Sequence, residues 1–263
     1  MFHLKGSAPS SEDPEKEVEP TAPAYLAFKP TFASISLYNG DCIRILQFPQ
    51  KDIDMLRGVI KQSWVKGIQK ERLFYSSCYE FKLRGNPWNG SAWTGSESIP
   101  SRILMREIFA YLFSVGWILY TSNDDTLIFR QQQTSPPECD WISITFHRND
   151  RLRLIGASRE LIASFRDMLK SMELLQDEFW KEMENNAWEF KIKGYPWLFL
   201  GEDMVKGSLL LLRIVETLET HGWSLYSNTR RRLSGQNGMI SFSNGWFCVK
   251  DKQWATGMPI VCG

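Results

Sequence analysis

The sequence predicts an α+β protein made of two pseudo-repeated units, each an antiparallel sheet with helices on one face. Three observations predict this fold class. One ten-residue segment occurs twice in the chain, and apolar and polar residues alternate with period two in several short stretches. Each copy also contains one long apolar helix. Together they indicate a duplicated domain.

The repeat keeps one spacing across separate elements. The segment 79–88, YEFKLRGNPW, returns at 188–197 as WEFKIKGYPW, and 33–46 aligns with 142–155 at the same spacing of 109 positions. Farther along, the spacing becomes 106 because the loop after Trp88 is longer in the first copy. A spacing this constant means that both copies contain the same elements in the same order.

Each copy begins with a predicted hairpin. The stretch 33–46 alternates isoleucine and leucine with serine, and its YNGD sequence favours a tight turn because Asn and Gly tolerate positive φ. The stretch 142–155 repeats the alternation. Both hairpins therefore have one face for the core.

Two helices and three further strands complete each predicted copy. Amphipathic spacing predicts the first helix, and the second is apolar around most of its circumference, so we expect it to be buried in the centre. Gly116 and Gly222 suit the left-handed cap that ends this helix. The expected ranges are helices 50–66 and 99–115 with strands 79–84, 117–122 and 126–131, then helices 158–181 and 204–221 with strands 188–193, 223–228 and 239–250.

Counted from the strand at 79–84, the elements run strand, helix, four strands, helix. This order resembles units of the TATA-binding-protein-like fold, in which helices cover one face of an antiparallel sheet. The resemblance implies β-α-β4-α units, with the second unit permuted across the chain ends. Residues 32–46 would then share a sheet with 239–249, and the two units would be related by a pseudo-twofold axis.

The repeated EFKhxGxPW phrase (h, apolar) also resembles an uncharacterised eukaryotic family of duplicated proteins. The resemblance covers about residues 31–250 and implies no activity, cofactor or partner. We expect a disordered leader at 1–30, which is rich in Pro, Ser and Glu, and a duplicated α+β domain at 31–250. Its copies span about 32–140 and 141–250, and the tail at 251–263 remains unassigned.

Composition narrows the class of protein. With 43% hydrophobic and 23% charged residues, the chain is typical of a globular protein, and its net charge of +1 disfavours a strongly basic nucleic-acid binder. Five scattered cysteines form no C-x-x-C pair and indicate neither a disulfide framework nor a zinc site. Without a signal peptide or transmembrane segment, we expect a cytoplasmic or nuclear protein that uses no cofactor or metal.

The repeated strand suggests one functional surface. Phe81 and Leu83 alternate with Glu80 and Lys82, and the second copy repeats the pattern, so charged side chains gather on the face away from the helices. The basic candidates for ligand binding are Lys82, Arg84, Arg44, Arg151, Arg153, Lys191 and Lys193. This face has two interpretations: an anion-binding surface, or an ordinary solvated face with weak ion pairs.

Other conspicuous residues have mainly structural interpretations. Matched Trp88 and Trp197 are typical of loop anchors, although exposed tryptophans can bind a peptide. Asp41 and Asp150 lie in hairpin turns without a histidine or metal-ligand companion. In a loop absent from the first copy, RRRLS offers Ser234 to a basophilic kinase.

No catalytic motif occurs in the sequence, so the leading hypothesis is a non-enzymatic binding or scaffold protein that contacts a protein partner of unknown identity. The alternative is an anion-binding module for nucleic acid, phosphopeptide or phospholipid. An enzyme with an unrecognised site between the units is the third. The sequence leaves the oligomeric state open.

Overall fold

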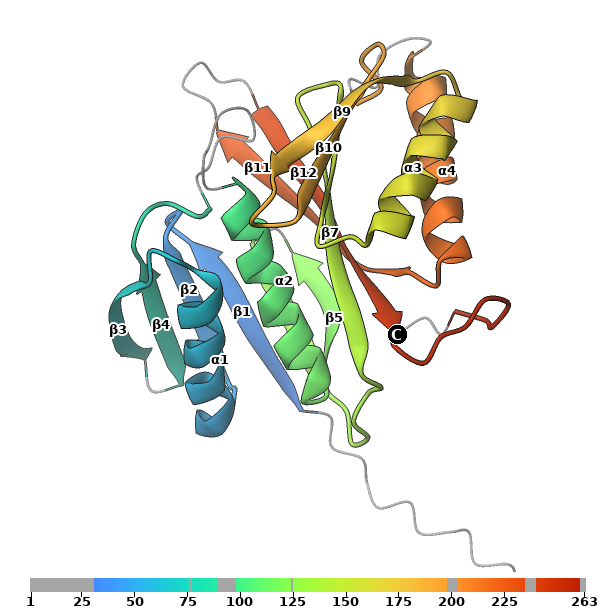
Figure 1. Cartoon of the computed structure of the whole chain (residues 1–263). Coiled ribbons are helices and arrows are strands. Elements are labelled where there is room, and N and C mark those ends of the chain that lie inside the picture. The colour runs from blue at the N-terminus through green and yellow to red at the C-terminus, as the bar shows by residue number, and fades with distance from the viewer. Residues whose placement is uncertain are drawn as a thin grey trace, which may run out of the picture. The chain divides into compact units, whose positions relative to one another are not determined.

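The protein contains two six-stranded antiparallel sheets, each with two helices (Figure 1). The computed structural model describes residues 31–75, 77–88, 98–123, 125–197, 203–234 and 240–260. The α+β class and the two repeated units that the sequence predicts are confirmed. The expected leader at 1–30 lies outside the described residues.

Sheet 1 is built by the first copy alone. Its strand order is β3-β4-β2-β1-β6-β5, and helices α1 and α2 pack on one face. The elements are β1 (Phe32–Tyr38), β2 (Cys42–Leu46), α1 (Gln50–Ser63), β3 (Ile68–Tyr75), β4 (Cys78–Leu83), α2 (Ser98–Ser114), β5 (Trp117–Asn123) and β6 (Thr126–Gln131).

Sheet 2 repeats this order with the second copy, as β11-β12-β7-β8-β10-β9. Helices α3 and α4 pack on the face that corresponds to the helix side of sheet 1. The elements are β7 (Cys139–His147), β8 (Arg151–Ile155), α3 (Arg159–Ser171), β9 (Leu175–Glu182), β10 (Ala187–Ile192), α4 (Asp203–Thr220), β11 (Ser224–Ser234) and β12 (Ile240–Asp251).

The permuted, TATA-binding-protein-like arrangement is wrong. Strand β1 pairs with β6 of its own copy, in the register Ser34 to Ile128, and β12 pairs with β7, in the register Phe247 to Ser143. Strands 32–46 and 239–249 therefore belong to different sheets. The correct pairing is the more local one, which costs less loop-closure entropy than joining the chain ends.

The sequence prediction also missed the edge strands β3 and β9. The helix expected over 158–181 ends at Ser171, because Glu173 adopts the left-handed φ of 56° and the chain turns into β9. Charged residues in both strands hid their alternation. Such residues suit an edge strand, where they discourage pairing with another chain.

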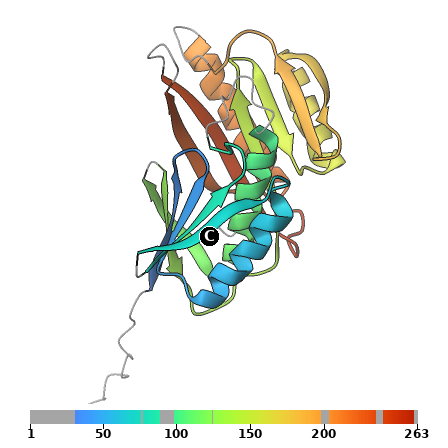
Figure 2. The ribbon, with the colours of Figure 1, turned by 90° about the vertical axis from the view of Figure 1, so that its left-hand side faces the viewer.

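Helix α2 packs against both sheets. Its Leu104, Ile108 and Leu112 belong to the core of sheet 1, and Ile99 packs with Ile155 of sheet 2. In Figure 1, α2 lies between β1 and β12, and Figure 2 shows the same elements turned by 90°. In the described residues α2 therefore separates sheet 1 from sheet 2, and α3 and α4 pack on the other face of sheet 2. This stacking is head-to-tail, so the predicted pseudo-twofold axis is also wrong.

Candidate binding surface

The repeated strands β4 and β10 each carry a buried glutamate that holds two arginines. In sheet 1, Glu80 accepts hydrogen bonds from Arg44 Nε at 2.8 Å and Arg72 Nε at 2.7 Å. Burial opposes ionisation of Glu80, but the two guanidinium groups outweigh it and lower its pKa. The glutamate is therefore charged and fixes both arginines on the sheet face.

The corresponding cluster in sheet 2 is more deeply buried. Glu189 accepts from Arg153 Nη2 at 2.6 Å and from Arg151 Nη1 at 3.2 Å. The Arg153 side chain is only 5% exposed, whereas the Arg72 side chain of sheet 1 is 47% exposed. The two faces have similar chemistry but differ in access to solvent.

The predicted basic residues do not form one surface. Arg44 and Lys82 lie on sheet 1, with Arg84 directly after β4, whereas Arg151, Arg153 and Lys191 lie on sheet 2. Lys193 lines a separate hollow beside Lys170 and Glu178. Lys82 Nζ lies 3.2 Å from Asp41 Oδ2, so ion pairs offset part of the positive charge that the sequence suggested.

The outer face of sheet 1 carries exposed aromatic rings beside its arginines. The Arg44 guanidinium lies 3.7 Å from the ring centre of Tyr38 and 4.3 Å from that of Phe74. Arg72 also lies over the Phe74 ring, 4.8 Å from its centre. The result is an ordered cation–π stack that exposes both rings, 43% of Tyr38 and 37% of Phe74.

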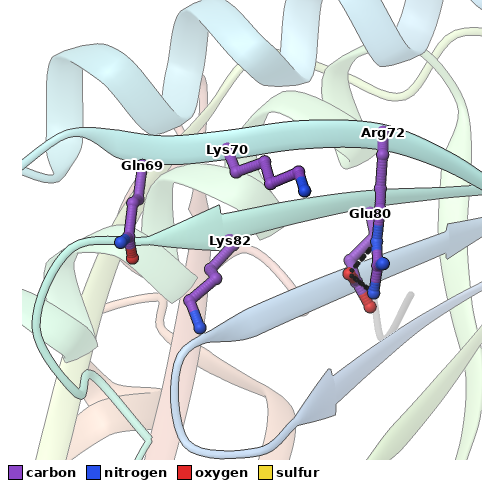
Figure 3. A pocket seen from close by; sticks show the side chains of 5 residues that line it. All are labelled: Gln69, Lys70, Arg72, Glu80 and Lys82. Atoms are coloured by element: carbon purple, nitrogen blue, oxygen red, sulfur yellow. Dashed lines mark hydrogen bonds and ion pairs between the residues drawn. The ribbon is translucent and has the colours of Figure 1, made fainter.

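A shallow hollow of about 460 Å³ adjoins this stack, between β3 and β4. Figure 3 shows its lining: Gln69, Lys70, Arg72, Glu80 and Lys82, with Arg72 paired to Glu80. Both lysines reach the hollow from neighbouring strands. The described lining of the hollow therefore combines positive charge with amide and carboxylate groups and includes no apolar side chain.

A second aromatic pair lies at the other end of the same face. Phe32 and the bulged residue Tyr120 make an edge-to-face contact with ring centres 5.4 Å apart, and Arg130 lies 5.9 Å from the Tyr120 ring. Tyr120 is 61% exposed. We call this face of sheet 1 the open face. It consists of Phe32, Tyr38, Arg44, Leu46, Lys70, Arg72, Phe74, Cys78, Glu80, Lys82, Tyr120, Thr126, Ile128 and Arg130.

The corresponding face of sheet 2 is covered by α2. Trp141 and Tyr226 form an edge-to-face pair at 4.8 Å, and Phe113 of α2 packs against both rings. Phe109 packs on Phe247 of β12 at 5.0 Å. Ser143, Thr145 and Arg153 alternate with apolar residues as on a solvated face, but α2 buries them.

A hydrogen bond at Tyr226 helps to tie the covered face to the first copy. The Tyr226 hydroxyl accepts from the backbone N–H of Leu119, which lies in β5, at 2.8 Å. Burial raises the pKa of Tyr226 to about 12, so this tyrosine remains protonated at neutral pH. Tyr120 is its counterpart in the first copy, bulged at the same position of the paired strands.

The matched tryptophans anchor loops, as their structural interpretation required. Trp88 Nε1 donates to the Cys42 carbonyl at 3.1 Å, and Trp197 Nε1 donates to the equivalent Arg151 carbonyl at 2.9 Å. Ser234 is the last residue of β11, opposite Ile240, and not part of a loop. Within the described residues, no group of three metal-ligating side chains occurs.

Sequence reasoning missed the residues that define the open face. Arg72 and Phe74 lie in β3, a strand that was not predicted, and Tyr38 and Tyr120 were not assigned to the polar face. A signal existed: in IQKERLFY, residues 68–75, Lys70, Arg72 and Phe74 alternate with Glu71 and Leu73. Recognising that alternation would have placed Arg72 opposite Glu80.

The fold and this surface define a class: a duplicated α+β protein in which one copy covers the polar sheet face of the other. The model of one uncharacterised domain matches the chain twice, over residues 31–134 and 140–249. The chain therefore belongs to this domain family and carries the domain twice. The expectation of an uncharacterised duplicated family is confirmed in that form.

Other comparisons add little. Among solved structures, the crystal structure of a conserved kinetoplastid-specific protein from Trypanosoma cruzi matches at 19% identity with a TM-score of 0.30. The match covers 41% of this chain and 94% of that one, and a likeness this weak carries no argument about fold or function. No curated protein matches. Among the described residues, no helix is long and apolar enough to span a bilayer.

Proposed function

We propose that this protein is a non-enzymatic binding protein that contacts a protein partner through the open face of sheet 1. One observation carries the proposal. The same face of sheet 2 is occupied by a helix, whereas the open face keeps its aromatic and aliphatic side chains exposed in the described structure. A sheet face that accepts a helix within the chain is a suitable site for another protein.

The side chains of the open face favour a protein over a bare anion. Aromatic residues and arginines dominate the energetics of protein interfaces. Here the arginines are already held by Glu80, which limits both their free charge and the side-chain entropy lost on binding. A partner therefore meets a rigid surface of rings and guanidinium planes.

Affinity capture with paired variants tests this proposal. Phe74→Ala combined with Lys70→Glu alters the open face, and Met55→Ala combined with Lys51→Glu makes the same kind of change on the exposed side of α1. We expect the wild type and the α1 variant to retain a partner that the open-face variant loses. Equal retention by all three proteins, or by none, would contradict the proposal.

The alternative is a single-stranded nucleic acid as the ligand of the open face. The stack of Tyr38, Arg44, Phe74 and Arg72 favours this second candidate, because bases stack on aromatic rings and guanidinium planes. A fluorescent oligouridine titrated at several salt concentrations tests it. Phe74→Ala should weaken binding about tenfold, since one stacked base contributes about 1–3 kcal/mol.

The basic residues provide a matched control for that titration. Lys82→Glu with Arg84→Glu alters the first copy, and Lys191→Glu with Lys193→Glu alters the second. A nucleic acid on the open face should respond to the first pair and much less to the second. For an enzyme with a site between the units, the described structure offers little support, because Phe109 and Tyr226 pack together there.

A further inference from the structure

The contact between α2 and sheet 2 is a template for a second interface. Along one side of α2, Ile99 packs with Ile155 and Ala187, and farther along Phe109 and Phe113 pack against the aromatic residues of the covered face. Arg102 lies over Gly245 and Arg106 lies over Gly156. At both glycines a Cβ would overlap the guanidinium group. One helix side and one sheet face thus fit each other.

Each apolar position of that sheet face has a counterpart on the open face, and the counterparts Phe32, Leu46 and Tyr120 are exposed. The repeat spacings and strand registers pair Ile155 with Leu46 and Tyr226 with Tyr120. Leu46 is 38% exposed, whereas Ile155 is fully buried. The other equivalent positions are Ala187 with Cys78, Trp141 with Phe32, and Phe247 with Ile128.

The helix side of the template also has an exposed counterpart, on α4. Positions 99, 103, 106 and 109 of α2 correspond to Val205, Leu209, Leu212 and Val215, which share one side of α4. These four side chains are exposed, Val205 by 68% and Leu212 by 61%. We call this side the α4 ridge, with members Val205, Ser208, Leu209, Leu212, Val215, Glu216 and Glu219.

Side-chain size and charge match between the ridge and the open face. Where the template pairs large Arg102 with Gly245, the counterparts are small Ser208 and the larger Thr126. On the ridge, Glu219 occupies the position that corresponds to Phe113 of α2. On the open face, the site that corresponds to the Phe113 contact on sheet 2 adjoins Arg130. Arg130 occupies the position of buried Val249. The acidic end of the ridge would therefore meet a basic end of the open face.

We infer that the α4 ridge of one copy of this protein docks on the open face of a second copy, as α2 docks on sheet 2 within the chain. This inference rests on the proposed function and names its partner. In one chain, α4 and the open face belong to opposite outer layers, so the contact is between molecules. It is heterologous and assembles chains head-to-tail into a ring or an open filament.

Sedimentation velocity over a range of concentrations tests the inference with two variants. A ridge variant carries Leu209→Glu and Leu212→Glu, and a face variant carries Leu46→Glu and Tyr120→Glu. All four positions are exposed, so we expect both variants to fold. The wild type should form assemblies larger than the monomer, and each variant should associate at least about tenfold more weakly. Met55→Glu on α1 is the control that should assemble like the wild type.

Mixing the two variants gives the sharpest result. The ridge variant keeps its open face and the face variant keeps its ridge, so the mixture should form a one-to-one heterodimer and nothing larger. A wild type that stays monomeric, a single variant that still assembles, or a mixture that stays monomeric would each overturn the inference.

The inference and the proposed function can fail separately. If the wild type is monomeric but loses a captured protein when Phe74→Ala and Lys70→Glu are introduced, the open face binds another partner and only the inference fails. If the open-face variant retains every partner, its own chain included, both fail.

Discussion

At the residue scale, Glu80 and Glu189 make the same kind of ion pairs in different surroundings. Each holds two arginines on a sheet face, but Arg44 and Arg72 remain partly exposed, whereas Arg153 is buried under α2. Removing a carboxylate costs most when the remaining guanidinium has no access to water. The local environment, more than the shared chemistry, sets the effect of each residue on stability.

Glu189→Gln should therefore destabilise the protein more than Glu80→Gln. We expect a loss of about 3 kcal/mol for Glu189→Gln, as for a broken buried ion pair, and about 1 kcal/mol for Glu80→Gln, where water replaces part of the contact. Urea unfolding at pH 7 measures both. Equal losses, or a larger loss for Glu80→Gln, would contradict this account.

The effect of Glu80→Gln should also depend on pH. Because the folded protein lowers the pKa of Glu80, its charged contacts stabilise the fold above the unfolded value of 4.5. That contribution is lost as the pH falls below 4.5 through the lowered folded pKa. The difference between wild type and Glu80→Gln should therefore shrink in acid, and a difference that grows there would reverse the assigned sign.

Tyr226 and Tyr120 provide a second pair of residues. Tyr226→Phe leaves the Leu119 N–H without its acceptor and should cost about 1–3 kcal/mol, whereas Tyr120→Phe should change stability by less than about 0.5 kcal/mol.

The folded state favours neutral Tyr226, whose pKa is about 12. Its contribution is present below the ordinary value of 10 and is lost as the pH rises through 12. Ultraviolet titration should show one fewer late-titrating tyrosine in Tyr226→Phe.

At the element scale, the sequence predicts most of the secondary structure. Alternation in residues 33–46 and 142–155 correctly predicts both hairpins, and the repeated phrase at 79–88 and 188–197 correctly predicts β4 and β10. The sequence prediction missed the edge strands β3 and β9, because charged residues on an exposed edge need not alternate with apolar ones. The sequence predicts that the long helix of each copy is buried on most sides. This prediction holds for α2 but not for α4, because one side of α4 is exposed.

Two glycines with positive φ, Gly222 after helix α4 and Gly194 after strand β10, supply a test with a built-in control. Gly222 has φ of 80°, and a Cβ there would overlap the Trp254 ring, whereas Gly194 has φ of 77° with nothing within 4 Å. Gly194→Ala should cost about 1 kcal/mol from backbone strain alone. Gly222→Ala should cost more and should displace residues 252–260, which limited proteolysis would detect. Equal stability of the two variants would contradict the packing role of Trp254.

At the scale of the whole molecule, the candidate site could not be predicted from one sequence. Ser143, Thr145, Arg153 and Glu189 are typical of a solvated sheet face, yet α2 covers them. Periodicity reports which residues share a face, but it does not report what packs against that face. The distinction between a covered face and an open one comes from tertiary packing between the two copies.

The two copies should accordingly depend on each other. Expressed as separate chains divided after Pro136, between β6 and β7, the halves should associate, because Phe109 and Phe113 otherwise lose the covered face. Co-purification of a tagged first half with an untagged second half measures this association. Two halves that purify separately as folded monomers would show that α2 contributes little to joining the copies.

The double role of α2 has a consequence during synthesis. The helix is complete at Ser114, but β12, which supplies part of its second partner, ends at Asp251. At about 5–20 residues per second, a ribosome needs about 7–27 s to make the chain between them. Until β12 is made, Phe109 lacks the Phe247 side of the covered face. We expect the nascent first copy to be the stage at which this protein most needs a chaperone.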